Sequence, residues 1–434
     1  MRENSSPSLL NVTIADNLAL DDGGGVFCWD NSNPGLENVS ISGNSASDDG
    51  GGIFCGRNCN VSFVNVSISG NSASVKGGGL CYYRCSPSLT DVTISDNSAF
   101  GGGGVFFDTS HPSLVCMSIS NNYATWGGGV FCDWQSTMNL VDVKIGGNSA
   151  GLGAGIYFDW SFNSSLENVT INDNSAYGDG GGIYYDLSPG QSLMNVTISN
   201  NTSTSYGGGI YCSSSSPNLE NVTLTNNSAA LGGGIFCWWS SDPSLENCIL
   251  WNNIPQEILF HPMDFPNSIT ISCSDIQGGE EGIDTNDNGT VYWLENNIDE
   301  YPLFCNPDSS YYRLQLDSPC RTDVCGFMGY TGDTCLGEDV EEQVAEPLQF
   351  SLSQNYPNPF NPTTTIEYTL PYPQEIRLEV YNLLGQQVAL LAEGMQTSGR
   401  HRVTFAGNAH PSGIYLYTLK IPHQIISRKM VLVR

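Results

Sequence analysis

Basic residues are scarce in this sequence. Lysine and arginine together number 14, against 44 aspartates and glutamates, and the formal net charge is −30. A chain this acidic repels the phosphates of nucleic acids and the surfaces of anionic membranes. We therefore expect no nucleic-acid partner, whereas divalent cations should be attracted.

Long apolar runs are also missing. No stretch reaches the roughly 18 apolar residues that a membrane-spanning helix needs, so the sequence predicts no transmembrane helix. The opening residues MRENSSPSLLNVTI lead directly into a repeat, without the charged and apolar regions of a signal peptide and without a cap over the first unit. These features predict a start that is truncated or wrongly placed within a longer gene.

What the sequence has in abundance is one repeated unit. Each unit opens on an apolar anchor and reads approximately L-x-x-V-x-I-x-x-N, followed by a glycine-rich triplet and a short apolar run such as GIFC or GIYY. The ten anchors, which recur at nearly constant spacing, are Leu9, Leu36, Phe63, Leu89, Leu114, Leu140, Leu166, Leu193, Leu219 and Leu245. Eight residues after each anchor stands an asparagine: Asn17, Asn44, Asn71, Asn97, Asn122, Asn148, Asn174, Asn201, Asn227 and Asn253.

Two architectures have a period of this length. A leucine-rich repeat would need a helical or 3₁₀ second half, but here that half contains a glycine triplet, and glycine is a poor helix former. The alternative is a parallel β-helix, in which each unit forms one coil and equivalent residues stack about 4.8 Å apart. The sequence favours an all-β, right-handed parallel β-helix of about ten coils, with the asparagines stacked at a bend.

The paired signals I-x-x-N and G-G-G-[IVL] resemble the repeats of chlamydial polymorphic outer-membrane proteins and of related pectate-lyase-like β-helices. The resemblance covers roughly residues 1–320. It implies the fold and leaves the activity open, because that fold hosts both enzymes and adhesins.

The repeat pattern and the composition divide the chain into four parts. We expect β-helix repeats over residues 1–254, C-terminal coils and a cap over 255–336, an acidic linker over 337–347, and a separate domain over 348–434. Strand-like segments with turn signals predict a small immunoglobulin-like antiparallel sandwich in this last part. Up to residue 347 the charge is −33 (7 basic, 40 acidic residues), and beyond it +3 (7 basic, 4 acidic).

The last domain carries NYPNPFNPTTTIEYTLP, VYNLLGQQV, SGIYLY and KMVLVR, in that order. These motifs resemble the type A C-terminal sorting domain of the type IX secretion system. The resemblance implies that residues 348–434 contact the type IX secretion machinery. It also implies a location outside the cell, or on the outer-membrane surface of a Gram-negative, Bacteroidetes-like bacterium.

Aspartates recur at one position in three successive units: Asp133, Asp159 and Asp186, with Trp134 and Trp160 beside the first two. Outward-pointing carboxylates and aromatic rings could hold a sugar chain, or could act as a catalytic acid and base. A solvated acidic face is the plainer alternative. None of the basic residues of the repeats is expected near these aspartates. The basic residues in question are Arg57, Lys76, Arg84, Lys144 and His111.

Residues 284–295, DTNDNGTVYWLE, fit the spacing of a calcium-binding loop. In that interpretation Asp284, Asn286 and Asn288 offer side-chain oxygens, Thr290 offers its carbonyl, and Glu295 closes the cage. The flanking sequences do not resemble the helices of an EF-hand. Calcium is therefore one hypothesis and an uncoordinated turn is the other.

Twelve of the fifteen cysteines fall into three groups. One is expected to fill a buried column shared with aromatic residues: Cys28, Cys55, Cys81, Cys132 and Cys237, with Phe106, Phe158 and Tyr185. Cys59 and Cys85 lie one coil apart, where a disulfide, an unbonded ladder or, together with Cys55 and Cys81, a zinc site is conceivable. Disulfides are expected after the repeats, among Cys273, Cys305, Cys320, Cys325 and Cys335.

Repeated NVT and NVS triplets have the form of glycosylation acceptors. Their asparagine shares its column with Asp91, Asp142 and Cys116, so a structural role in the stack explains the column better. From the sequence we therefore expect a secreted or surface β-helix that acts as a binding or adhesive rod, with a polysaccharide or a cell-surface ligand. A polysaccharide lyase or a glycoside hydrolase is the alternative.

Overall fold

A computed structural model of the chain places two compact units. The described residues are 1–263, 265–306, 311–315, 317–330, 351–355, 357–370, 374–382, 384–396, 399–408, 410–421 and 424–433. The first unit covers residues 1–304 and 312–336, and the second covers 305–311 and 337–434. The predicted acidic linker at 337–347 and Cys335 lie outside the described residues.

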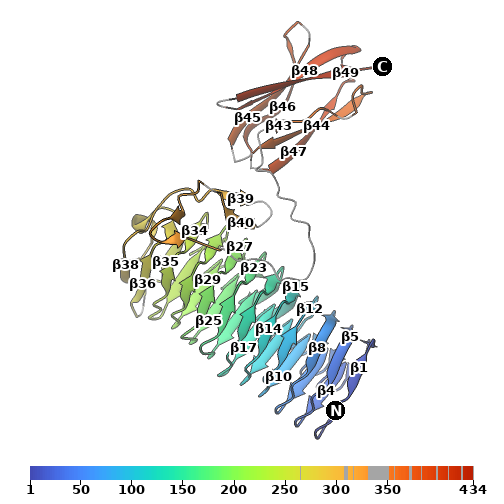
Figure 1. The fold of residues 1–434 in the computed structure, drawn as a ribbon, viewed down its shortest axis with the longest axis vertical. Helices are drawn as coiled ribbons and strands as arrows, with labels where there is room; N and C mark the ends of the chain where they lie inside the picture. Colours follow the sequence, from blue (N-terminus) through green and yellow to red (C-terminus); the bar gives the residue numbers. More distant parts are fainter. Residues whose placement is uncertain are drawn as a thin grey trace. The chain divides into compact units, whose positions relative to one another are not determined.

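The first unit is a β-solenoid of about 11 turns (Figure 1). Its largest sheet has 12 parallel strands, which contain the V-x-I half of each repeat. They are β1(Ser8–Leu10), β2(Thr13–Ala15), β5(Gly35–Ser42), β8(Ser62–Ser69), β12(Val92–Ser95), β15(Ser118–Ser120), β19(Lys144–Gly146), β23(Thr170–Asn172), β27(Thr197–Ser199), β31(Thr223–Thr225), β34(Ile249–Trp251) and β37(Asp275–Ile276).

The apolar run after each glycine triplet forms a second sheet, of ten parallel strands. They are β4(Val26–Trp29), β7(Ile53–Gly56), β10(Leu80–Tyr83), β13(Val105–Asp108), β17(Val130–Asp133), β21(Ile156–Asp159), β25(Ile183–Asp186), β29(Ile210–Ser213), β32(Ile235–Trp238) and β35(Ile258–Phe260). We call it the ten-stranded sheet, and it carries the predicted acidic residues.

The anchor residues form a third, nine-stranded sheet. Its strands are β11(Ser88–Thr90), β14(Ser113–Val115), β18(Asn139–Val141), β22(Ser165–Glu167), β26(Ser192–Met194), β30(Asn218–Glu220), β33(Ser244–Glu246), β36(Asn267–Ser272) and β38(Gly289–Trp293). In the first coils the anchors Leu9, Leu36 and Phe63 belong instead to strands of the 12-stranded sheet.

Short strands follow the asparagine in many coils. Four of them pair in one sheet: β16(Tyr123–Trp126), β20(Ser149–Leu152), β24(Ser175–Ala176) and β28(Thr202–Ser203). Three pair in another: β3(Leu18–Ala19), β6(Ser45–Ala46) and β9(Ser72–Ala73). Among the described residues the only helical element is the 3₁₀ turn η1(Glu280–Gly282). A leucine-rich repeat requires a helical or 3₁₀ second half in every unit, so this alternative does not apply.

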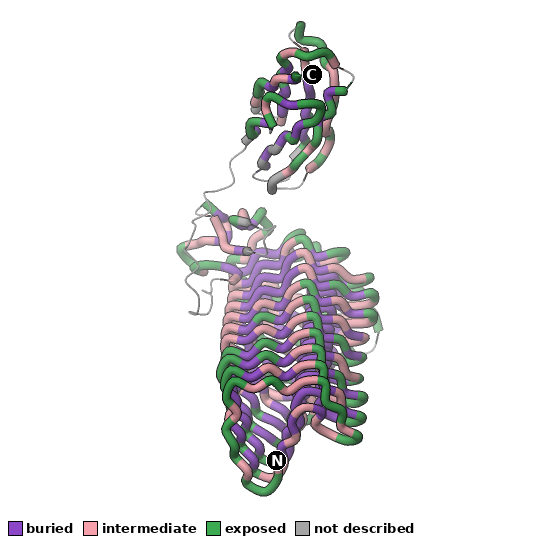
Figure 2. The backbone as a smooth tube through the Cα atoms, turned by 90° about the vertical axis from the view of Figure 1, so that its right-hand side faces the viewer, coloured by how far each residue is buried: buried purple, intermediate pink, exposed green. Residues whose placement is uncertain are grey.

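The interior of the solenoid is a set of stacked apolar columns. Leu140, Val143 and Ile145 of one coil are fully or almost fully buried, and their equivalents in the neighbouring coils are buried in the same register. Figure 2 shows these buried positions continuing from coil to coil. Each coil thus adds the same apolar layer to the core, which explains why the same residue pattern recurs along the sequence.

The predicted asparagine ladder is present and continuous. The Oδ1 of Asn174 accepts from the backbone nitrogen and from Nδ2 of Asn148, both at 3.0 Å. The Nδ2 of Asn148 also donates to the carbonyl of Ile119 at 3.1 Å, and its Oδ1 accepts two bonds from Asn122. Asn148 is fully buried, so each such side chain satisfies polar groups that no solvent can reach.

The bend has left-handed backbone at the residue before each ladder asparagine, whereas the sequence pattern placed the asparagines themselves at the bend. The residues that precede the ladder asparagines have positive φ: Asp16, Gly43, Gly70, Asp96, Asn121, Gly147, Asp173, Asn200, Asn226 and Asn252. A second left-handed column, at φ 51–55°, contains Asn11, Asn38, Asn65, Asp91, Cys116, Asp142, Asn168, Asn195, Asn221 and Asn247. It includes the asparagines of the NVT and NVS triplets except Asn60. Asn and Asp tolerate this conformation, which supports a structural role for that column.

A serine ladder, not foreseen from the sequence, lines another corner. The backbone nitrogen at one coil donates to the side chain one coil on, as from Ser188 to Ser215 Oγ at 3.0 Å. Cys59 and Cys85 occupy this ladder: Ser32 donates to Cys59 Sγ at 3.3 Å, and Cys85 donates to Ser110 Oγ at 3.1 Å. Both cysteines are free thiols, so the unbonded-ladder alternative is the one observed.

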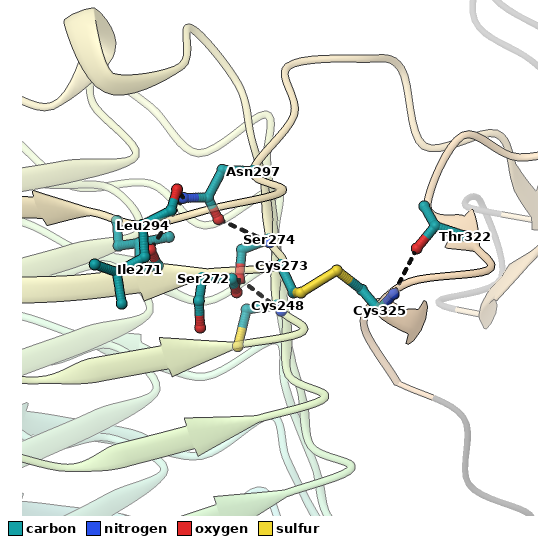
Figure 3. Close-up of a disulfide and its surroundings, with 9 residues drawn as sticks. All are labelled: Cys248, Ile271, Ser272, Cys273, Ser274, Leu294, Asn297, Thr322 and Cys325. Atoms are coloured by element: carbon teal, nitrogen blue, oxygen red, sulfur yellow. Dashed lines mark hydrogen bonds between the residues drawn. A yellow bond between two sulfur atoms is a disulfide. The ribbon is translucent and has the colours of Figure 1, made fainter.

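The solenoid continues past the ten repeats recognised in the sequence. Ile271 of β36 stacks on Leu245, and Trp293 of β38 stacks on Ile271. A segment that contains β41(Arg321–Thr322) and β42(Gly326–Phe327) then packs on the outer face of the 12-stranded sheet, where Met328 meets Ile249. The disulfide Cys273–Cys325 joins this segment to the last coils (Figure 3). The preceding strands are β39(Phe304–Asn306) and β40(Tyr311–Leu314).

The second unit contains two antiparallel sheets around one apolar core, as predicted. The three-stranded sheet has β43(Ser351–Leu352), β44(Thr363–Leu370) and β47(Gly399–Ala406), and the four-stranded sheet has β45(Gln374–Asn382), β46(Gln387–Gln396), β48(Gly413–Ile421) and β49(Gln424–Leu432). Met430 and Leu432, from the terminal KMVLVR, are buried in that core.

Candidate functional site

The predicted aspartates lie in register at the ends of adjacent strands. Asp133, Asp159 and Asp186 are direct neighbours in β17, β21 and β25, and Asp108 of β13 precedes them. We call these four residues the acidic column. Asp108 was missed because the pattern placed Phe106, rather than Phe107, in the buried column of that coil.

Strand alternation decides which way these side chains point. In β21, Ile156 and Phe158 fill the interior, whereas Tyr157 and Asp159 lie on the outer face. The inner column runs Cys55, Tyr82, Phe107 and Cys132, so the prediction that Cys81 and Phe106 share it is wrong. In those two coils the stretch from the strand to the next anchor is shorter by a single residue, so counting back from the anchor selects the wrong face.

A second apolar column runs beside the acidic column on the outer face. It consists of Phe54, Cys81, Phe106, Phe131, Tyr157, Tyr184, Tyr211, Phe236 and Leu259, and all are buried. Tyr184 and Tyr211 stack with ring centroids 4.4 Å apart. The residues just before the glycine triplets cover this column; Tyr206, for example, stacks on Phe236 at 4.6 Å. The part of this outer face that solvent reaches is therefore the C-terminal end of each strand of the ten-stranded sheet, where the acidic column lies.

Two tryptophans stand on the other side of the acidic column. Trp134 and Trp160 are 53% and 45% exposed, and their ring centroids are 5.8 Å apart. Both have left-handed backbone, at φ 37° and 48°, as do the residues at this position in the neighbouring coils, such as Thr109 and Leu187, so this conformation belongs to the turn of the repeat. Thus a pair of exposed rings is held next to half-buried carboxylates.

The carboxylates of Asp133, Asp159 and Asp186 are harder to ionise than free aspartate. Burial, together with the charges of Asp133 and Asp186, raises the pKa of Asp159 to about 6. Burial also raises the pKa of Asp186, although a hydrogen bond with Ser213 opposes it. The face therefore concentrates negative charge in a place where water solvates it incompletely.

One basic residue does reach the column, contrary to the prediction. The Nζ of Lys76 lies 3.9 Å from the nearer oxygen of Asp133, and it sits over the ring of Phe106 at 4.3 Å. Burial raises the pKa of Asp133; Lys76 opposes this shift and Asp108 adds to it. Lys76 belongs to a coil that is not adjacent to the coil of Asp133, and only the length of its side chain brings them together.

The predicted calcium-binding residues form a turn and a strand of the last coils. The side-chain nitrogens of Asn286 and Asn288 donate to the carbonyls of Phe260 and His261, at 2.7 and 2.8 Å. Asp284 Oδ1 accepts from the backbone nitrogen of Asn286. Thr290 lies in β38, which pairs with β36, and Glu295 follows this strand. Calcium binding here stays a prediction.

Among the described residues, one group of three or more His, Cys, Asp or Glu side chains has ligand atoms within 4.8 Å of one another. It is Asp21, Asp22 and Asp48, which is distant in sequence from both predicted metal sites. The cysteines of the first coils do not form such a group, and the zinc alternative gains no support. A hollow beside Glu257 offers no free acid, because Asn253 engages both carboxylate oxygens.

Together, the stacked coils and the antiparallel C-terminal unit define a parallel β-helix protein with a separate terminal domain. Residues 51–221 and 179–305 match the family described as the right-handed β-helix region. These matches span more than half of the chain, so the chain belongs to the right-handed β-helix family. Residues 38–56 also match the Chlamydia polymorphic membrane protein repeat. Comparisons with curated proteins and with solved structures gave no match.

Residues 354–433 match the secretion system C-terminal sorting domain. The chain therefore carries a sorting domain of the type IX secretion system, and the protein is exported to the cell surface or the extracellular space. In the described residues, no helix has the length and apolar character needed to cross a membrane.

Proposed function

We propose that this protein is an exported rod that binds an extended glycan along the acidic column and the Trp134–Trp160 pair. The observation that carries the proposal is the exposure of these two neighbouring rings beside carboxylates that are partly desolvated. Aromatic faces stack on the apolar faces of sugar rings, and carboxylates accept bonds from sugar hydroxyls.

The spacing of the coils supports a polymeric ligand. Successive carboxylates are separated by about 4.8 Å, the strand spacing of a β-sheet. This distance is close to the length of one sugar unit in an extended β-linked chain. A glycan parallel to the solenoid axis would therefore place one sugar over each coil, from Asp108 to Asp186.

Affinity electrophoresis and calorimetry with neutral, acidic and amino polysaccharides test the proposal. Replacing both Trp134 and Trp160 by alanine is expected to weaken binding at least about tenfold, since each stacked ring contributes roughly 1 kcal/mol. Tyr292→Ala is the matched control, because this residue is also about half exposed but lies on the nine-stranded sheet. Equal binding by parent and double variant, or binding of no glycan, would reject the proposal.

Hydrolysis is a second candidate because of the carboxylate geometry. Neighbouring carboxylates are one coil apart, near the roughly 5 Å of retaining glycosidases, and Asp133 and Asp186 are two coils apart, near the upper range of inverting enzymes. The raised pKa of Asp159 suits a general acid. Release of reducing sugar by the parent, and its loss in Asp159→Asn, would support this alternative; an elimination product would indicate a lyase.

A further inference from the structure

We propose that the ligand of the acidic column is a cationic glycan, namely a β-linked amino-sugar polymer whose amines are free and protonated. This inference rests on the proposed glycan-binding function and adds the chemical class of the ligand. It is carried by the way the protein itself places an ammonium group on the column.

The contacts of Lys76 show that the acidic column can hold an ammonium group. Its ammonium lies between the carboxylate of Asp133 and the ring of Phe106, with the ring of Tyr83 at 5.7 Å. The side chain is 29% exposed, so the charge is partly removed from water and is held by a carboxylate and aromatic faces together. The same combination recognises ammonium groups of ligands in general.

A buried acceptor at the start of the column has no donor. Asp49 is 9% exposed, and its Oδ1 has no hydrogen-bond partner among the described residues. The carboxylate is hydrogen bonded to Tyr83, which directly precedes Asp108 in the register of the ten-stranded sheet. Asp49 therefore lies near the coil in which the column begins, and its buried, unpaired oxygen is an acceptor that a ligand donor would satisfy.

The far half of the column has negative charge and no counter-charge. In the described part of the chain, no lysine, arginine or histidine lies within 4.0 Å of Asp159 or Asp186, whereas Asp133 has Lys76. An amine above these two carboxylates would play the part that Lys76 plays above Asp133. Polymers that carry carboxylates would be repelled by the same charges.

The arrangement suits a linear ligand better than a metal ion. The four aspartates follow one another along the solenoid axis and do not belong to the one described cluster whose ligand atoms converge. In a two-fold glycan chain, alternate sugars present the same edge, so equivalent amines recur about every two coils. Asp108 and Asp159, or Asp133 and Asp186, have that separation.

Calorimetry on the full chain with three soluble oligosaccharides of equal length tests the inference: a fully deacetylated glucosamine oligomer, the matching cello-oligomer and an oligogalacturonate. The glucosamine oligomer is expected to bind about tenfold or more tightly than the cello-oligomer, and added salt should reduce this preference. The oligogalacturonate should bind most weakly.

The variant Asp159→Asn with Asp186→Asn should lose the preference for the amine, so that the glucosamine oligomer binds no more tightly than the cello-oligomer. Asp186→Ser is a second variant that the fold accommodates, since Ser213 occupies the same column one coil on. Glu167→Gln with Glu220→Gln, on the nine-stranded sheet, removes the same charge elsewhere and should leave the preference intact.

Two outcomes overturn the inference, and they are distinguishable. Equal affinity for the amine and cello-oligomers, with no effect of the aspartate variants, would reject the cationic ligand but leave the glycan-binding function standing. Failure to bind any of the oligomers, in a sample whose circular dichroism shows the folded β-structure, would reject both.

Discussion

Glu257 accepts two hydrogen bonds from Asn253, one from its backbone nitrogen at 3.0 Å and one from its Nδ2. Every earlier asparagine of the ladder gives these bonds to the asparagine of the next coil, as Asn227 does to Asn253. Glu257 therefore ends the ladder and supplies the oxygens that another asparagine would have supplied. It does so while 5% exposed, and burial raises its pKa to about 7 despite the bonds from Asn253.

The pH dependence of stability is the first prediction. Between its ordinary value of 4.5 and about 7, the folded protein keeps a proton on Glu257 that the unfolded chain has lost. The contribution of this group to stability is thus largest at low pH and declines as the pH rises through that window. Glu257→Gln should remove the decline and raise the free energy of unfolding above pH 7, by up to about 3 kcal/mol.

Melting curves measured across this pH range for the parent and for Glu257→Gln provide the measurement. Glu246→Gln, an exposed glutamate of β33, is the control and should melt like the parent at every pH. Parallel pH profiles for the parent and Glu257→Gln would show that Glu257 is not the titrating group.

The second prediction concerns the middle of the ladder. Asn148→Leu removes the acceptor of two bonds from Asn122 and the side-chain donor to the carbonyl of Ile119, and these buried groups lose those partners. Asn174 Oδ1 keeps only the bond from the backbone nitrogen of residue 148. We expect a loss of about 1–3 kcal/mol in the free energy of unfolding, measured by denaturant titration. Ser165→Ala, on the outer side of β22, is a control with little expected effect. Unchanged stability in Asn148→Leu would show that the ladder bonds contribute no net stability.

The periodic parts of this fold could be predicted from the sequence, because each coil repeats the same solution. Leu140, Val143, Ile145 and Asn148 occupy the core and ladder positions that their spacing indicates. Three of the four residues of the acidic column were predicted for the same reason, since Asp133, Asp159 and Asp186 keep one place in consecutive units. A strict period fixes both the register and the face of each residue.

The remaining features depend on departures from the period. Where the stretch before the next anchor is shorter by a single residue, Tyr82 and Phe107 replace Cys81 and Phe106 in the interior, and Asp108 moves onto the acidic column. The contact of Lys76 with Asp133 depends on side-chain reach across coils, which no spacing rule describes. The serine ladder did have a signal, because serine or cysteine recurs about four residues before most anchors.

Calcium binding by residues 284–295 is the third prediction. If the loop holds the ion, calcium should raise the melting temperature of the parent, and Glu295→Gln should reduce that effect by removing the closing charge. Because β38 pairs along its length with β36, the expected site requires Glu295 to reach back past an extended strand. Calorimetry that detects no binding at about millimolar calcium, the weakest range of protein sites, would leave the segment as a turn of the last coils.

The final prediction concerns export through the terminal domain. Its core is formed within the domain by residues such as Phe360, Tyr417 and Leu432, so the sorting signal is expected to work apart from the solenoid. A fluorescent protein that carries a signal peptide and residues 338–434 should reach the surface or the medium of a host with type IX secretion. Deleting residues 429–434 removes the buried Met430 and Leu432, and this reporter should remain in the periplasm.

A point variant separates recognition of the terminal strand from its role in folding. Lys429 is exposed on β49, between strand residues that pair with β48, so Lys429→Ala should leave the domain folded. If export of this fusion falls while its β-rich circular dichroism is preserved, the machinery reads the surface of the strand. If it is exported normally and the deletion is not, the strand acts through the fold. Equal export of the intact and deleted fusions would show that residues 429–434 carry no sorting information.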